Sequence, residues 1–163
     1  MLSRSAEYAV RALSLLAVRG EETSVQSREI AEVLGLPPQF LTKILRRLTA
    51  TGLVASQRGR SGGFRLSRAP ESIPLLEVVM PFEEQRFDDV CLLGQGFCDD
   101  QEECPLHNPM IEIQTAFYTL LENTMLADVA PRAIRSSGSP MNRGSKSEST
   151  GTRPVAESTI GGS

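Results

Sequence analysis

Apolar residues recur every three or four positions near the start of the chain, and this spacing predicts an amphipathic helix. The stripe lies between Ser3, whose side chain is suited to capping a first helical turn, and Gly20, which is suited to ending the helix. Its apolar members are Tyr8, Ala9, Ala12, Leu13 and Leu16.

Two shorter stripes follow, separated only by Gly35-Leu36-Pro37. In the first, SREIAEVLG, Ser27 is expected to cap a helix that Gly35 ends. In the second, PPQFLTKILRRLTATG, Pro38 suits the first turn and Gly52 the end. Two short helices joined in this way predict a helix-turn-helix, although an ordinary helical hairpin has the same pattern. The buried side of the second helix should contain Phe40, Leu41, Ile44, Leu45 and Leu48.

After Gly52 the helical period gives way to alternation. The stretches LVASQRG and FRLSR alternate apolar and polar residues, and the connecting RGRSGG contains three glycines and two arginines. This pattern predicts a β-hairpin wing with Arg58 and Arg60 at its tip and Arg65 and Arg68 on the returning strand. Glycines let a backbone approach a narrow groove, where arginine is favoured. Duplex DNA is therefore the expected partner, and RNA fits less well because its deep groove would not admit a helix.

The distribution of charge favours the same partner, although the net charge of the chain is only −3. Residues 1–70 contain eleven Lys/Arg and five Asp/Glu, whereas residues 71–130 contain one and thirteen. Seven basic residues and no acid lie between Leu36 and Arg68. Such a segment in an acidic chain indicates a surface for polyanions, with a solvated basic face as the simpler alternative. The DNA-binding residues expected from these patterns are Gln39, Thr42, Lys43, Arg46, Arg47, Arg58 and Arg60.

The acidic half begins with a short predicted helix, from about Pro74 to Met80, and ends with a helix of about five turns. The apolar seam of the longer helix is Met110, Ile113, Phe117 and Leu120. No other element of this half covers the seam, so two copies are expected to pack together in a homodimer. Packing on the first helix of the same chain is an alternative that another face could satisfy.

These patterns predict a mainly α fold with a small β-hairpin wing, a winged helix-turn-helix, followed by a long C-terminal dimerisation helix. The expected division is a DNA-binding domain at 1–80, a cysteine-containing loop at 81–108, the dimerisation helix at 109–130 and a disordered tail at 131–163, almost without apolar residues from Ser136. No apolar run reaches the length of a membrane span and no signal peptide opens the chain, so a cytoplasmic location is expected.

The three cysteines and the only histidine of the chain all lie in one acidic loop, with the spacing Cys91-x6-Cys98-x5-Cys104-x2-His107. Three thiolates and an imidazole are suited to an iron–sulfur cluster or to a Cys3His zinc site. The close Cys104–His107 pair is typical of zinc, and thiol switching without a metal is a third possibility. From the spacing alone, the cluster and zinc are equally well matched. Catalysis is not expected, because the sequence has one histidine, no Ser/His/Asp set and no phosphate-binding loop, and so offers few catalytic groups.

Several motifs occur together: the opening MLSRSAEYAVRAL, the stretch IAEVLGLPPQFLTKILRRLTATGLVASQRGRSGGFRLSR, the three cysteines and CPLH. In this combination, about four fifths of the chain resembles the Rrf2 family of bacterial winged-helix regulators. The resemblance implies that Cys91, Cys98 and Cys104 hold a [2Fe–2S] or [4Fe–4S] cluster. It also implies that redox state, nitric oxide or iron status alters operator affinity through the cluster.

Three cysteines leave one ligand position open, and the resemblance offers two residues for it. Family members with the same Cys-x2-His arrangement use the histidine, which is His107 here. Others carry a carboxylate in the first helix that reaches the cluster of the partner subunit, and Glu7 is at that position. Imidazole matches iron better and needs no second chain, so His107 is the expected ligand.

Overall fold

The structure is a computed structural model that describes residues 2–20, 22–57, 59, 62–83 and 104–135. Helices dominate the described residues, which also contain one two-stranded antiparallel sheet. The predicted fold class, a mainly helical winged helix-turn-helix, is confirmed. None of the described helices is long and apolar enough to cross a membrane. The elements in chain order are α1 (Arg4–Arg19), α2 (Ser27–Leu34), α3 (Pro38–Ala50), β1 (Val54–Gln57), β2 (Gly63–Leu66), η1 (Pro70–Ser72), α4 (Leu75–Val79), η2 (Met80–Phe82), α5 (His107–Asn123) and α6 (Leu126–Arg135).

The first helix, α1, has both of the predicted ends. The Ser3 hydroxyl accepts a hydrogen bond from the Ala6 amide at 3.2 Å, which satisfies one of the free amides of the first turn. Gly20 adopts φ 94°, a conformation that a helix cannot continue. The stripe between these ends is the centre of the core, where Ala6, Ala9, Ala12, Leu13 and Leu16 are all buried.

The two helices α2 and α3 form the helix-turn-helix, joined through Gly35 in the left-handed region at φ 64°. One predicted cap was wrong, because Gln26 and not Ser27 precedes the helix, and no side chain caps it. The reason is that Val25 is already paired with the wing, so the chain must turn at Gln26. Phe40, predicted to be buried, is only partly so. Its ring packs edge-on against Tyr8 of α1 at 5.6 Å.

Strands β1 and β2 form the predicted wing, with Val54 opposite Leu66. Val25 adds a short third partner, because its amide and carbonyl both exchange hydrogen bonds with Phe64 at 2.9 Å. Arg65 lies on the returning strand as predicted, whereas Arg68 lies beyond it and pairs with Glu77 of α4.

The C-terminal part differs from the predicted single helix at 109–130. Helix α5 ends at Asn123, Thr124 is extended, and α6 then runs to Arg135, so the stretch 131–135 predicted as tail is helical. The chain is pinned at the break, where the Leu75 amide bonds to the Thr124 carbonyl at 2.9 Å and the Leu126 amide to the Ile73 carbonyl at 2.8 Å. Residues 136–163 lie outside the described part of the chain.

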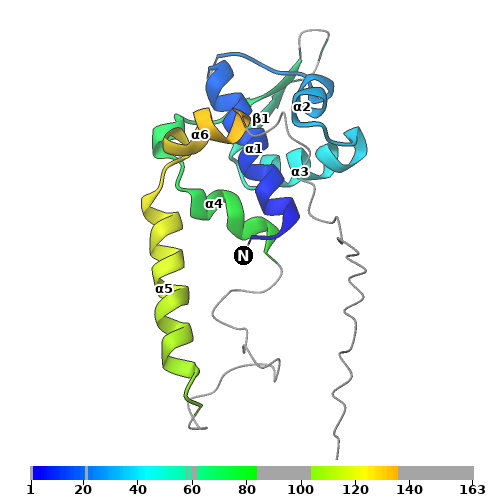
Figure 1. Cartoon of the computed structure of the whole chain (residues 1–163). Coiled ribbons are helices and arrows are strands. Elements are labelled where there is room, and N and C mark those ends of the chain that lie inside the picture. The colour runs from blue at the N-terminus through cyan, green and yellow to red at the C-terminus, as the bar shows by residue number, and fades with distance from the viewer. Residues whose placement is uncertain (1, 21, 58, 60–61, 84–103, 136–163) are drawn as a thin grey trace, which may run out of the picture.

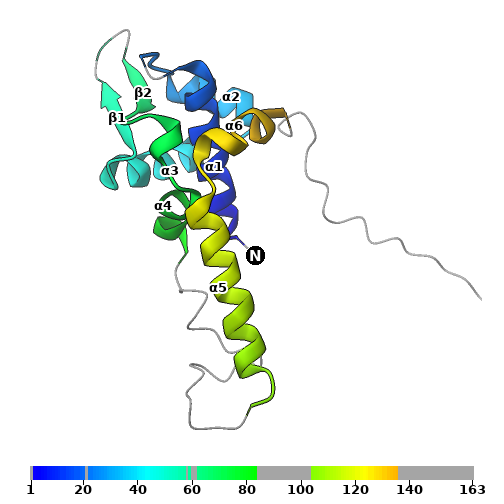
Figure 2. The same cartoon turned by 90° about the vertical axis from the view of Figure 1, so that its left-hand side faces the viewer.

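The two C-terminal helices have different surroundings. Helix α6 packs on α1 and buries Leu126 and Ala130 against it, as the alternative reading of this region anticipated. Helix α5 instead extends away from the winged-helix unit and packs on it mainly through α4 (Figures 1 and 2). The chain therefore has a globular head, made of all described elements except α5, and one projecting helix.

Candidate nucleic-acid interface and metal ligands

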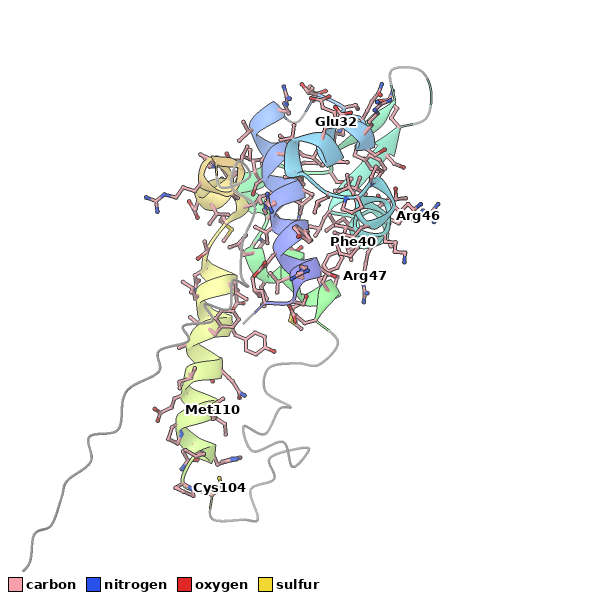
Figure 3. The ribbon with its side chains drawn as sticks, turned by 45° about the vertical axis from the view of Figure 1, so that its right-hand side comes forward. Glu32, Phe40, Arg46, Arg47, Cys104 and Met110 are labelled. Carbon is pink, nitrogen blue, oxygen red and sulfur yellow. The ribbon has the colours of Figure 1, made fainter. Side chains whose placement is uncertain are left out.

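The outer side of α3 carries the polar residues that the sequence predicted there. Gln39, Lys43, Arg46 and Arg47 are exposed, whereas Leu41, Ile44, Leu45 and Leu48 on the other side are buried. Arg46 and Arg47 project outward from the helix (Figure 3). A helix with one side fixed in the core and a cationic side facing water has the form of a recognition helix.

Thr42 differs from the other members of this set. It is half-buried, and its hydroxyl donates a hydrogen bond to the Pro38 carbonyl at 2.8 Å. The donor is therefore occupied within the helix, and the hydroxyl oxygen and the methyl group are what Thr42 can offer to a ligand. Arg58 and Arg60, the expected contacts at the wing tip, lie outside the described residues.

Arg47 has a neighbour that the sequence patterns did not reveal. Its guanidinium carbon lies 5.5 Å from the ring centroid of Phe82 in η2, within the range of a cation–π interaction. Phe82 is almost fully buried, at 7% exposure, so the ring is held in place by the head. No sequence signal indicates this contact, because the two residues are far apart in the chain and belong to different predicted units.

Phe82 and Glu83 are in turn attached to the beginning of α1. The Ser3 amide donates to Glu83 Oε1 at 2.8 Å, and the Ser3 hydroxyl donates to the Phe82 carbonyl at 3.2 Å. The same hydroxyl caps α1. These two residues therefore connect the first helix, the recognition helix and the segment that follows Glu83.

Of the four expected ligands in the cysteine loop, the structure describes Cys104 and His107. The His107 amide donates to the Cys104 carbonyl at 3.1 Å, so the two residues are one turn apart at the start of α5. Both are half-buried, and the Cys104 thiol is in no disulfide with a described residue. A thiolate and an imidazole so spaced can reach one metal ion. Cys91 and Cys98 lie outside the described residues, and the described residues alone contain no cluster of three metal-ligating side chains.

Glu7, the alternative fourth ligand, is in the first turn of α1 and half-buried. Helix α1 belongs to the head, whereas Cys104 lies at the outer end of α5 (Figure 3). Within one chain the structure does not bring Glu7 and Cys104 together. Ligation by Glu7 would therefore require the first helix of another subunit.

The fold and the cationic recognition helix define a winged helix-turn-helix DNA-binding regulator. A comparison with protein families identifies the family: residues 2–132 match the model for Rrf2, described as an iron-dependent transcriptional regulator. The chain belongs to the Rrf2 family and is a transcriptional regulator of that family.

Individual relatives support this assignment. The chain is 36% identical over 129 residues to the protein aau3 of Rhizobium meliloti, covering 78% of this chain and 83% of that protein. It is 32% identical over 129 residues to the HTH-type transcriptional regulator NsrR of Geobacillus kaustophilus, covering 78% of this chain and 88% of that one. The alignments cover most of each relative, and the family match over residues 2–132 includes the whole of α5.

Solved structures share the fold. CymR, the global cysteine regulator of B. subtilis, superposes with a TM-score of 0.70 at 25% identity, covering 80% of this chain and 96% of CymR. IscR of T. potens gives a TM-score of 0.66 at 24% identity, covering 83% and 90%. NsrR and CymR are both named as regulators.

Proposed function

We propose that this regulator binds a near-palindromic DNA operator as a homodimer in the cytoplasm, and that an iron–sulfur cluster sets its operator affinity. Cys91, Cys98, Cys104 and His107 would hold the cluster, of the [2Fe–2S] or [4Fe–4S] type. The observation that carries the proposal is the Cys104–His107 turn, which lies at the start of α5 in a member of a family described as iron-dependent. The signal would be redox state, nitric oxide or iron status.

The described half of the ligand set fits this group. Cys104 supplies a thiol that no described residue engages in a disulfide, and His107 lies one helical turn away. When bound, the cluster supplies a redox-active and nitric-oxide-reactive iron centre. The protein's own residues would then couple the state of the cysteine-containing loop to the affinity for DNA. A coupling of about 1–3 kcal/mol between the two sites would change operator affinity about 5- to 150-fold.

On the DNA side, we assign recognition to Gln39, Thr42, Lys43, Arg46 and Arg47 of α3. Arg58 and Arg60 of the wing would add minor-groove or phosphate contacts. Exposed cations on one side of α3, with its other side fixed in the core, support this assignment. Two heads in a dimer would read two half-sites about one helical turn apart.

The dimer is assigned to α5 because Ile113 and Leu120 of its apolar seam stay exposed among the described residues, whereas Met110 and Phe117 are half-buried. Ile113 and Leu120 are 62% and 60% exposed, and Ile111 is 45% exposed. Leu121 is the only residue of this helix that the head buries. Full burial of a Leu or Ile side chain is worth about 1.5–3 kcal/mol, so a second α5 packed along the seam would stabilise both chains.

A second candidate function is a winged-helix regulator without an iron–sulfur cluster, stabilised by zinc or switched by its thiols. The Cys104–His107 pair has the close spacing that structural zinc sites use, and CymR, a structural neighbour, is named as a cysteine regulator. Iron, acid-labile sulfide and zinc should be measured in anaerobically purified protein. Stoichiometric iron and sulfide that Cys104→Ser abolishes would support the cluster, whereas zinc alone, or no metal, would reject it.

The functional test is a comparison of DNA affinity before and after cluster removal. A fluorescent duplex selected by the wild-type protein from a random-sequence library serves as the probe. Fluorescence anisotropy should give affinities for the loaded and the cluster-free protein that differ at least fivefold. Equal affinities would leave the chain as a DNA-binding protein but remove the sensing role.

A further inference from the structure

We infer that Phe82 is a positioning residue for DNA binding. Its ring orients the Arg47 guanidinium on the recognition helix, and it couples this orientation to the state of the segment that carries Cys91 and Cys98. The first part concerns DNA binding by α3, and the second part rests on the proposed cluster function. The contact between Arg47 and Phe82 is the starting point of the argument.

Arg47 is a long, exposed side chain near the end of α3, and a free arginine there would sample many rotamers. The Phe82 ring, whose centroid lies 5.5 Å from the guanidinium carbon of Arg47, attracts the guanidinium. The N–H groups lie in the plane of the guanidinium and remain available at its edge, where a phosphate or a base binds. The contact with Phe82 and binding to DNA are therefore compatible, and the ring reduces the side-chain freedom lost on binding.

The ring can do this because its own position is fixed. Phe82 is 7% exposed, and its carbonyl accepts a hydrogen bond from the Ser3 hydroxyl. The next residue, Glu83, accepts from the Ser3 amide at 2.8 Å. Ser3 therefore holds two successive residues against the N-terminus of α1, while the Phe82 ring reaches the C-terminal end of α3.

The place of this pair in the chain gives it a second role. Glu83 is directly followed by the segment with Cys91 and Cys98, so Phe82 and Glu83 are the attachment of that segment to the head. Phe82 and Glu83 are the last described residues before that segment. The side chain next in line is Arg47, on the surface assigned to DNA. Binding of a cluster by Cys91 and Cys98 would thus alter the orientation of the Arg47 guanidinium on the DNA-binding surface.

A double-mutant cycle tests the first part, with Phe82→Leu removing the ring but keeping most of the apolar volume. In the wild-type background this change should weaken binding to the selected duplex about two- to fivefold at low salt. In an Arg47→Ala background it should have no further effect, because the cation is gone. In an Arg46→Ala background, the matched control, the full effect should persist. Melting temperatures of all variants check that the head remains folded.

Three results would overturn the inference. One is a Phe82→Leu effect of equal size in the Arg47→Ala background, since the ring would then act through general packing. Another is unchanged affinity for Phe82→Leu in otherwise wild-type protein. The third is unchanged affinity for Arg47→Ala, since Arg47 would then not contact DNA.

The second part is tested with the ratio of DNA affinities between cluster-loaded and cluster-free protein. Phe82→Leu should bring this ratio at least twofold closer to one, whereas Arg46→Ala should leave it at the wild-type value. An unchanged ratio for Phe82→Leu would overturn the link to the segment. If the wild-type ratio is itself one, the link and the proposed sensing function both fail, and the double-mutant cycle still decides whether Phe82 orients Arg47.

Discussion

The backbone of Gly63 packs directly against the backbone of Val25: a β-carbon at Gly63 would lie 2.6 Å from the Val25 carbonyl oxygen and 2.8 Å from its carbonyl carbon. The close approach is imposed by the pair of hydrogen bonds between Val25 and Phe64. The loop before α2 and the wing are therefore joined at a point that only glycine permits.

Gly63→Ala should separate Val25 from the wing and destabilise the protein by about 1–3 kcal/mol, since backbone atoms cannot move aside as a flexible side chain would. Chemical denaturation measures the loss. Ser56→Ala, on the exposed side of β1 opposite Phe64, is the control and should change stability by less than about 0.5 kcal/mol. A Gly63→Ala protein with wild-type stability would contradict the close packing.

Arg46→Ala should weaken DNA binding and reduce the slope of log affinity against log salt by about 0.9, because one phosphate contact and its released counterions are lost. Titrations at several salt concentrations give the slope. Arg132→Ala is the control: Arg132 is exposed on α6, which lies on the other side of α1 from α3 in Figures 1 and 2. Equal slopes for wild-type protein and Arg46→Ala would show that Arg46 does not contact DNA.

Ile113→Asp should convert the proposed dimer to a monomer, because a carboxylate would be buried without a partner in the α5 seam. Ile113 is 62% exposed in the single chain, so the head should remain folded, and sedimentation velocity measures the mass. Thr115→Asp places the same charge on another side of α5 and should leave the dimer intact. A wild-type protein that sediments as a monomer at micromolar concentration would rule out this interface.

His107→Ala should alter the visible absorption and Mössbauer spectra of the reconstituted protein, because one iron would lose its nitrogen ligand. Glu7→Ala should leave both spectra unchanged. Glu112→Ala, an exposed carboxylate on α5, controls for the loss of charge. If only Glu7→Ala changes the spectra, the fourth ligand comes from the first helix of the partner subunit.

Much of the head could be predicted from local patterns. Ser3 begins α1 and Gly20 and Gly35 end helices as expected, because capping and left-handed turns depend on nearby residues. The wing followed from a change of period at Gly52. The displaced cap at Gln26 was missed, because Val25 is held by a strand some forty residues away in the sequence, and helix-start signals contain no such information.

The C-terminal region was harder for a related reason. The predicted dimerisation helix at 109–130 includes Thr124, but α5 ends before it, where Thr124 and Leu126 form backbone hydrogen bonds with Leu75 and Ile73. Of the metal ligands, the turn between Cys104 and His107 fits its predicted use, whereas the roles of Cys91 and Cys98 stay predictions.

The break between α5 and α6 also determines how a movement at the Cys104 end of α5 is transmitted to the head. Thr124 and Leu126 are bonded to the residues around Pro74, so α5 leaves the head from a fixed base. The helix has 17 residues and is therefore about 25 Å long. At that length, a lateral movement of about 2 Å at the Cys104 end corresponds to a tilt of about 5° at the base. In the proposed dimer, α5 would thus act as a lever arm, and the angle at which two arms cross would set the distance between the two recognition helices.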